Sequence, residues 1–213
     1  MPNLTERRHQ QTRTTIADAA VALFIKHGFV ETTMDDIALA AGVSRRTAYR
    51  HFPSKDDLVF EQPRRWLQHF NTTIADHHPD ETPRQRCRRG LLAVAEVIQA
   101  NAESVLSAYA VFAATPSLRG TNGGIQNEWF ERYVELLTPP RRMSPARSLQ
   151  IATIASSLVG TTTMLTAMWS TSQPPADMTA MTNAVLNQLE PIWPDWLDRK
   201  PLHRVHRRIV REG

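Results

Sequence analysis

Two adjacent arginines, Arg45 and Arg46, stand in the segment SRRTAYRHF at residues 44–52. Ser44 is a favoured N-cap residue, so a short helix ending near His51 would carry both guanidinium groups in its first turn. The positive end of the helix dipole lies there, and this helix start contains no acidic side chain to offset it. Arginine in this position can bind a phosphate or donate two hydrogen bonds to the edge of a guanine. The segment therefore predicts DNA binding.

The two neighbouring helix starts have the opposite charge. In TTMDD the predicted N-cap Thr33 is followed three residues later by Asp36, and in SKDDL Ser54 is followed in the same way by Asp57. Both are variants of the capping box, with a carboxylate at the positive end of the helix. Of the three helix starts, the one after Ser44 is thus the one predicted to be open to an external anion.

Three short helices must position the arginines. The first is predicted over about 12–27, and the turn AAGVS joins the second helix to the third. Gly42 allows the unusual backbone angles of that turn, and Val43 can pack against both helices, as in a helix-turn-helix. Ala48 and Phe52, one helical turn apart, would face the small core. The side chains directed outward are then Arg45, Arg46, Tyr49 and Arg50.

From Ala17 to Leu58 the chain resembles the TetR family of transcriptional regulators. The resemblance is carried by the motifs G-[FY]-x-x-T-[ST], I-A-x-x-A-G-V-S and Y-x-[HY]-F-x-[SN]-K-x-x-L, which occur here as GFVETT, IALAAGVS and YRHFPSKDDL. It covers about a fifth of the chain. It implies a domain that binds operator DNA as a homodimer, with the third helix in the major groove.

The resemblance also implies roles by position. Arg45 and Arg46 would reach base edges, although Arg46 stands where the family often has a small residue. Phosphate contacts are implied for Thr33, Thr47, Tyr49, His51 and Lys55. With the other residues of the third helix, the predicted DNA-binding set is Thr33, Ser44, Arg45, Arg46, Thr47, Tyr49, Arg50, His51 and Lys55.

The rest of the chain follows a helical period, and alternation with a period of two is nearly absent. A fourth helix is predicted over 54–76, with a kink or break near Val59 to Gln62 because Pro63 lacks a backbone donor. The polar linker DHHPDETPRQ follows it. Further helices are predicted over about 84–115, 126–137, 144–170 and 176–190.

The predicted fold is therefore all-α, with two domains and a tail. A helix-turn-helix DNA-binding domain at 1–58 is connected by the helix at 54–76 to a helical ligand-binding and dimerisation domain at 80–198. A basic tail occupies 199–213. The tail holds six Lys and Arg and one Glu, a local charge of +5 in a chain of net charge +4, so the overall basicity alone does not indicate a nucleic-acid partner.

The family resemblance implies that the second domain binds a small molecule and dimerises through its last two long helices. Their apolar faces suit a four-helix bundle across a two-fold axis: Ile151, Ile154, Leu158, Leu165 and Trp169, with Met178, Met181, Val185, Leu186 and Leu189. The segment VFAATPSLRG and the tryptophan-bearing helix after it resemble regulators that bind acyl-CoA-like ligands.

The predicted ligand-binding residues are aromatic residues and methionines of this second domain and of the linking helix. Such residues at helical spacing are also common in a core, so packing is the alternative for each. An arginine cluster (Arg84, Arg86, Arg88 and Arg89) could meet a ligand phosphate or be a solvated helix start. The pocket set is Trp66, Phe70, Tyr109, Phe112, Trp129, Phe130, Tyr133, Met164 and Met168.

The sequence gives little support to an enzyme, a metalloprotein or a membrane protein. The sequence has no nucleophile elbow, P-loop, glycine-rich dinucleotide turn or H-E-x-x-H motif, so we do not predict an enzyme or a cofactor. The histidines near 76–78 and His69 are better explained by a polar linker than by a metal site. With one cysteine, Cys87, and no apolar run of about 18 residues, we expect a cytoplasmic protein without a membrane partner.

The function predicted is a ligand-responsive transcriptional regulator. It would act as a repressor, binding palindromic double-stranded operator DNA as a homodimer and releasing it on binding a small apolar or acyl-CoA-like effector. The alternative is a helix-turn-helix dimer that binds DNA without any small-molecule effector.

Overall fold

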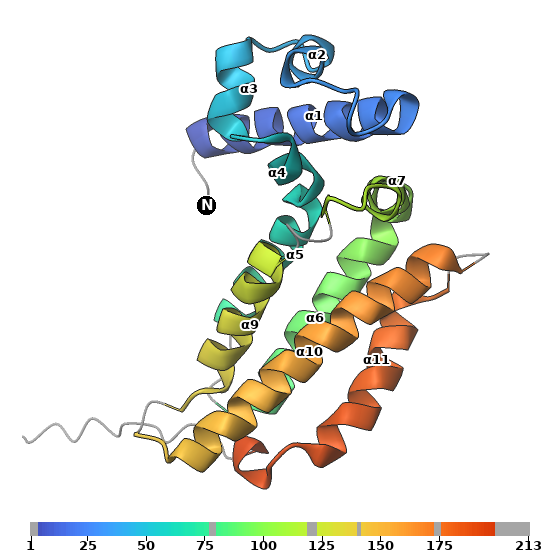
Figure 1. The fold of residues 1–213 in the computed structure, drawn as a ribbon. Coiled ribbons are helices and arrows are strands. Elements are labelled where there is room, and N and C mark those ends of the chain that lie inside the picture. The colour runs from blue at the N-terminus through green and yellow to red at the C-terminus, as the bar shows by residue number, and fades with distance from the viewer. Residues whose placement is uncertain (1–3, 77–79, 119–122, 140–141, 173–175, 199–213) are drawn as a thin grey trace, which may run out of the picture.

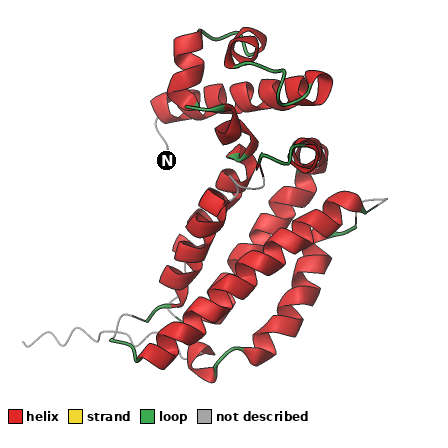
Figure 2. Ribbon diagram, in the orientation of Figure 1, coloured by secondary structure: helices red, strands yellow, loops and turns green. Residues whose placement is uncertain are grey.

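A computed structural model describes residues 4–76, 80–118, 123–139, 142–172 and 176–198, and these residues form helices and connecting loops without a strand (Figures 1 and 2). The all-α prediction is thereby confirmed for the described residues. The basic tail at 199–213 lies outside them. In chain order the helices are α1 (Leu4–His27), α2 (Met34–Ala40), α3 (Arg45–His51), α4 (Lys55–Val59), α5 (Glu61–Ala75), α6 (Pro83–Ala100), α7 (Ala102–Ala114), α9 (Gly123–Leu137), α10 (Pro145–Thr171) and α11 (Met178–Leu189), followed by the short 3₁₀ helices η1 (Glu190–Ile192) and η2 (Asp195–Asp198).

Helices α1 to α3 form the predicted helix-turn-helix unit, which lies at one end of the molecule (Figure 1). Gly28 ends α1 with a φ of 89°, and Gly42 makes the α2–α3 turn with a φ of 66°. These angles lie in the left-handed region that glycine tolerates best. Ile37, Ala48 and Phe52 are fully buried between the helices, as the spacing predicts.

Helix α1 begins earlier than the sequence predicts, at Leu4 instead of about residue 12. The added segment, LTERRHQQ at residues 4–11, has no apolar stripe, and its described side chains are exposed. The prediction relied on an apolar period, and a polar stretch of good helix formers gives no such signal.

A break at Phe60 separates α4 from α5. The predicted interruption near Val59 to Gln62 is confirmed. Pro63 then lies in the first turn of α5, where its missing backbone donor would have had no partner within the helix. The break turns the chain from the helix-turn-helix unit into the long bundle below it (Figure 1).

The predicted single helix over 84–115 is wrong. The chain bends by 91° between α6 and α7, at Asn101, whose side-chain amide donates to the carbonyl of Val97 at 2.8 Å. The apolar pattern continues across the bend because both helices bury an apolar face, so hydrophobicity alone hides the turn. As a result, α7 packs against α1 (Figure 1).

Two hydrophobic cores result from this arrangement. One fills the bundle of α5, α6, α9, α10 and α11, with Phe70, Tyr133 and Trp169 fully buried. The other belongs to α1 to α5 and is completed by Val111 of α7 and Ile125 of α9. The helix-turn-helix unit therefore shares its core with the second half of the chain.

The apolar faces that the sequence analysis assigned to dimerisation lie inside the protomer. Ile151, Leu158, Trp169 and Leu186 are almost completely buried in the core of the bundle. Most of these residues pack against α6, α9 and each other and are not available to a second chain, whereas Met181, Val185 and Leu189 of α11 are only partly buried. The outer face of α10 instead exposes Leu149, Met164 and Met168.

Candidate DNA-binding surface and ligand pocket

The start of α3 has the predicted cap and the predicted lack of acid. Ser44 Oγ accepts a hydrogen bond from the amide of Thr47 at 3.1 Å, and the first turn of α3 contains no Asp or Glu. Helices α2 and α4 each begin with a complete capping box. Hydrogen bonds from Thr33 hold the pKa of Asp36 below its usual value, which keeps a negative charge at the start of α2.

One acidic side chain does reach the arginines, from the neighbouring helix. Arg45 Nη1 lies 3.0 Å from Asp35 Oδ2 at the beginning of α2. The Arg45 side chain is 68% exposed and that of Asp35 56% exposed. Such an exposed ion pair contributes about 0 to 1 kcal/mol. A phosphate or a guanine edge can therefore replace Asp35 as the partner of Arg45.

Most of the predicted DNA-binding residues form one exposed surface on α3 and the start of α2. Tyr49 is 40% exposed, and its ring lies 5.5 Å from the Arg45 guanidinium carbon. Thr47 is half-buried. The exposed members of the set are Thr33, Ser44, Arg45, Arg46, Tyr49 and Arg50.

Lys55 differs from its predicted role as a phosphate ligand. Its Nζ donates to the backbone carbonyls of Phe29, Val30 and Thr32 at 2.8, 3.1 and 2.8 Å. It also lies 4.7 Å from the centre of the Phe29 ring. Because an ammonium group has three protons, these carbonyls use all of its donors. Lys55 thus ties α4 to the loop between α1 and α2.

His51 is also placed differently from the prediction. It is only 4% exposed, and its ring packs against that of His9 with centroids 4.3 Å apart. Burial, together with the positive charges of His9, Arg50 and Arg13, lowers the pKa of His51. A buried, neutral imidazole does not present itself to a phosphate. The early part of α1, which supplies His9, was missing from the sequence prediction.

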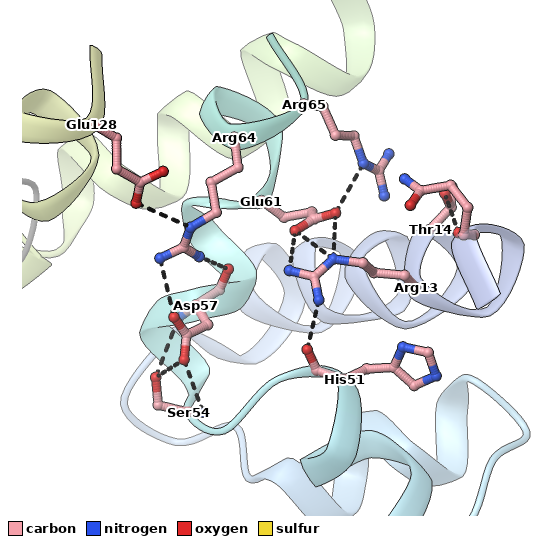
Figure 3. A network of polar contacts seen from close by, with 10 residues as sticks. Arg13, Thr14, His51, Ser54, Asp57, Glu61, Arg64, Arg65 and Glu128 are labelled. Atoms are coloured by element: carbon pink, nitrogen blue, oxygen red, sulfur yellow. Dashed lines mark hydrogen bonds and ion pairs between the residues drawn. The ribbon is translucent and has the colours of Figure 1, made fainter. Parts of the chain in front are cut away.

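A buried ion pair beneath α3 involves residues that the sequence analysis did not select. Arg13 of α1 binds both carboxylate oxygens of Glu61 at the start of α5, with distances between 2.6 and 2.9 Å (Figure 3). Arg13 Nη1 also donates to the carbonyl of His51 at 2.7 Å. Arg65 Nε donates to Glu61 at 3.1 Å. The group connects α1, the end of α3 and the start of α5.

A second ionic connection runs from α5 to α4 and α9. Arg64 lies 3.2 Å from Asp57 and 3.9 Å from Glu128, while Asp57 caps α4 together with Ser54 (Figure 3). The first two turns of α5 are thus bound to the helix-turn-helix unit on one side and to the bundle on the other.

A cavity with about 1120 Å³ of empty space, including its opening to solvent, lies between the α4–α5 break and helices α6, α7, α9, α10 and α11. Five of the nine predicted ligand-binding residues line it: Trp66, Tyr109, Phe112, Trp129 and Tyr133. Phe60 at the helix break also lines it and packs edge-on against Phe112, with ring centroids 6.1 Å apart. Phe60 belongs to the core of the helix-turn-helix unit, so the wall of the cavity is part of that core.

The other four predicted pocket residues do not line the cavity. Phe70 is fully buried behind it, where its ring packs against Trp129 and Tyr133 with centroids 5.3 and 5.6 Å away. Phe130 is partly buried against the bundle core. Met164 and Met168 are 60% and 56% exposed, because the helical phase of α10 directs neighbouring residues such as Thr162 and Thr166 into the cavity instead.

The arginine cluster at the start of α6 holds the bundle together. Arg84 lies 2.7 Å from Asp198, Arg88 2.9 Å from Glu190 and Arg89 2.7 Å from Glu81. None of these arginines lines the cavity. The guanidinium groups of Arg84, Arg88 and Arg89 bind carboxylates of the same chain, so they are not available to a ligand phosphate, whereas the buried Nε of Arg86 has no hydrogen-bond partner.

Metal and thiol chemistry have no candidate site within the described residues. No group of three or more potential metal ligands occurs there. His77 and His78 of the polar linker lie outside the described residues. Burial raises the pKa of the Cys87 thiol far above its usual value, which keeps it protonated and unreactive.

Residues 16–61 match the family described as bacterial regulatory proteins, tetR family. The chain is 46% identical over 52 residues to the putative mycofactocin biosynthesis transcriptional regulator MftR of Mycobacterium tuberculosis, covering 24% of this chain and 26% of that protein. It is 34% identical over 103 residues to the probable acrEF/envCD operon repressor of Escherichia coli K12, covering 46% and 47%. The chain thus matches half or less of the length of these curated relatives.

Solved structures with a similar fold cover more of the chain. The structure of a SmeT–triclosan complex has a TM-score of 0.62 at 19% identity and covers 88% of this chain and 94% of that one. The FadR regulator of Bacillus subtilis in complex with stearoyl-CoA has a TM-score of 0.58 at 17% identity and covers 83% and 96%. At such identities the similarity concerns the fold alone.

Proposed function

We propose that this member of the tetR family of bacterial regulatory proteins is a ligand-responsive repressor. It binds palindromic double-stranded operator DNA as a homodimer and releases it when a small apolar molecule occupies the cavity. The observation that carries the proposal is the exposed surface of α3, where Arg45 and Arg46 stand in a first turn without an acid and Arg50 follows in the last turn. Proteins of this family regulate transcription and are not enzymes.

DNA recognition follows from the chemistry of α3. The Arg45 and Arg46 side chains reach base edges in the major groove, while Tyr49, Arg50, Thr47 and Thr33 bind the phosphates beside it. The short α3 is held rigidly from behind by Ala48 and Phe52, so its outer side chains keep a fixed register. His51 and Lys55 support this surface from inside instead of touching the DNA.

The outer face of α10 supports a homodimer. By length and composition, α10 is the one unbent helix among the described residues that could cross a membrane. Only 28% of its most apolar stretch is buried within the protomer, so much of this apolar helix is left uncovered. One such helix is weak evidence for a membrane span. The same face, with Met164, Met168 and Gly160, suits a two-fold contact with a second copy of the chain. A dimer places two α3 helices about one turn of DNA, roughly 34 Å, apart. We place such a regulator in the cytoplasm.

The path from the cavity to α3 passes through the α4–α5 break. Phe60 and Phe112 line the cavity and pack into the core of the helix-turn-helix unit. Glu61, the residue after Phe60, is bound to Arg13, which is bound to the end of α3. A ligand that displaces the rings tilts the helix-turn-helix unit and changes the spacing of the two α3 helices in the dimer.

The experiment begins with selection of the bound sequence from random DNA duplexes by the purified full chain. Fluorescence anisotropy then gives the affinity for the selected duplex, with and without candidate apolar ligands, while native mass spectrometry gives the oligomeric state. Tight binding that weakens with a ligand supports the proposal. Tight binding that no apolar or acyl-thioester compound changes favours the alternative, a DNA-binding dimer without an effector. Failure to select any sequence would overturn both.

A further inference from the structure

The cavity has no charged lining. Among the described residues that surround it, the polar groups are those of two glutamines, two tyrosines, threonines of α10 and α11 and the indole N–H groups of two tryptophans, and none of them carries a formal charge. An ionised group placed there would lose its hydration without gaining a counter-charge. The cavity therefore favours a ligand without a formal charge.

The cations closest in sequence to the lining residues already have partners. On α5, Arg64 binds Asp57 and Glu128, and Arg65 binds Glu61. On α6, Arg86 does not line the cavity, and Arg84, Arg88 and Arg89 bind carboxylates of the same chain. Recruiting any of these guanidinium groups to a ligand would leave a carboxylate unpaired, so they do not offer a site for an anionic group.

Tyr133 is the buried polar side chain of this lining that lacks a hydrogen-bond partner. Its side chain is fully buried and lines the cavity, and its hydroxyl forms no hydrogen bond of acceptable geometry. The Phe70 and Trp129 rings pack against it, both with centroids 5.6 Å away, so the phenol cannot turn toward solvent. Burial raises its pKa well above the usual value, which keeps the hydroxyl protonated and able to donate.

The nearest candidate partner within the chain is the Thr162 hydroxyl. The Thr162 hydroxyl is close enough to lower the pKa of Tyr133 slightly against the effect of burial. The two hydroxyls nevertheless do not meet the geometry of a hydrogen bond. Thr162 donates its own proton to the carbonyl of Leu158 at 2.8 Å. A buried hydroxyl without a partner is unfavourable, and an oxygen atom supplied by a ligand would satisfy it.

We infer that the effector is an uncharged molecule, apolar over most of its surface, with a carbonyl or similar oxygen that accepts a hydrogen bond from the Tyr133 hydroxyl. This inference rests on the proposed function, because it names the ligand of the same cavity. It favours the small apolar effector over the acyl-CoA-like one, since the phosphates of coenzyme A require cations that this lining does not supply.

Three compounds with the same eleven-carbon skeleton test the inference: methyl nonyl ketone, undecanoate and undecanoyl-CoA. Their affinities for the full chain are measured by isothermal titration calorimetry in the absence of DNA. We expect the ketone to bind at least about tenfold more tightly than undecanoate, because the carboxylate would have to be desolvated without a partner. Equal or tighter binding of undecanoate or undecanoyl-CoA would overturn the inference, as would the absence of binding by the ketone.

The role of Tyr133 is tested with Tyr133→Phe, which removes the hydroxyl and keeps the ring. We expect the affinity for the ketone to fall about threefold to tenfold. Thr72→Val is the control, because it removes a hydroxyl from an exposed position of α5 outside the cavity, and its affinity should stay within about twofold of the original. Equal affinities of the original chain and Tyr133→Phe would overturn the assignment.

Thermal unfolding of the ligand-free variants gives a second readout. If the Tyr133 hydroxyl has no internal partner, Tyr133→Phe unfolds at the same temperature as the original chain or higher. A lower unfolding temperature would show that the hydroxyl is satisfied within the chain and would overturn the inference. This measurement does not depend on any ligand.

DNA binding separates this inference from the proposed function. If the ketone binds through Tyr133 but does not change the affinity for the selected duplex, the regulatory proposal fails and the chemistry of the pocket stands. If undecanoyl-CoA releases the DNA and the ketone does not bind, the regulatory proposal stands and the inference fails.

Discussion

Arg13 and Glu61 form a bidentate ion pair that joins the first helix of the chain to the first residue of α5. The Glu61 side chain is 3% exposed and that of Arg13 22% exposed. The same guanidinium group binds the carbonyl of His51 and lies 4.2 Å from the centre of the Phe52 ring. Since Phe60 and Gln62 on either side of Glu61 line the cavity, this pair connects the pocket wall to the end of α3.

Substitution Glu61→Gln should destabilise the chain. The amide keeps the size of the side chain but leaves Arg13 and Arg65 without their shared carboxylate. We expect a loss of about 2 to 4 kcal/mol in the free energy of unfolding, below the maximum for buried pairs because Arg13 is partly exposed. Urea unfolding measures the loss. Arg64→Gln, in a more exposed pair, is the control and should cost less than about 1 kcal/mol.

The double variant Arg13→Met/Glu61→Met tests whether this pair also transmits the ligand signal. Apolar side chains of similar length can replace a buried ion pair with little loss of stability. We expect the double variant to fold and to bind the selected duplex. A ligand that releases DNA from the original chain should weaken DNA binding by the double variant less, with a change in binding free energy under about half of that in the original chain. A ligand response equal to that of the original chain would exclude the pair from the coupling.

Substitution Arg45→Ala should relax the base preference of the protein. A bidentate contact with a base is worth about 1 to 3 kcal/mol, and we expect a loss of that size on the selected duplex with a smaller loss on random DNA. The ion pair with Asp35 is exposed, so its removal has little effect on folding. Anisotropy titrations with both duplexes provide the comparison. Equal losses on the two would remove Arg45 from the base-reading residues.

Lys55 and Arg50 should respond differently to salt. Lys55→Met removes the donors for three backbone carbonyls, so we expect it to lower stability by about 1 to 3 kcal/mol while the salt dependence of DNA binding stays the same. Arg50→Ala should keep the stability and reduce the slope of log affinity against log salt by about one unit. A reduced slope for Lys55→Met would show that the Lys55 side chain contacts a DNA phosphate directly.

The helix-turn-helix geometry behind the proposed DNA-binding surface could be predicted from the sequence largely because its signals are local. The cap at Ser44, the glycine turn at Gly42 and the apolar spacing of Ala48 and Phe52 each depend on residues within a few positions of one another. Because Ala48 and Phe52 face the core, the arginines of α3 must lie on the opposite, exposed side of the helix. Local rules of this kind carry over to the folded chain without knowledge of its tertiary contacts.

The errors arise where distant segments meet. Arg13 and Glu61 are 48 residues apart, and nothing local to either distinguishes them from surface charges. His51 is buried because the polar beginning of α1 covers it, and Lys55 finds its carbonyls in a loop more than 20 residues away. The bend at Asn101 places α7 against α1, a helix that begins far earlier in the sequence. Such features come from the tertiary arrangement, to which periodicity and capping give no access.

Stability should decrease in acid because of His51. Its pKa in the folded chain is lower than the ordinary value of 6.5, so the unfolded chain takes up a proton first as the pH falls. We expect the free energy of unfolding to decrease below about pH 6.5, by up to about 1.4 kcal/mol per pH unit. Thermal unfolding at pH 7.5 and pH 5.5 measures this. His51→Phe should flatten the dependence, and an unchanged slope in this variant would contradict the assignment.

Substitution Gly160→Arg should convert the proposed dimer into monomers. Gly160 lies on the exposed side of α10, and a Cβ atom built there meets nothing within 4 Å, so the protomer tolerates the side chain. In a two-fold contact between α10 helices, the substitution places two like charges close together in a dehydrated interface. We expect a monomer in sedimentation velocity, with unchanged helicity and an affinity for the palindromic duplex reduced more than tenfold. Gln68→Arg, at an exposed position of α5, is the matched control and should remain dimeric. A dimeric Gly160→Arg variant would show that the chain self-associates through another surface.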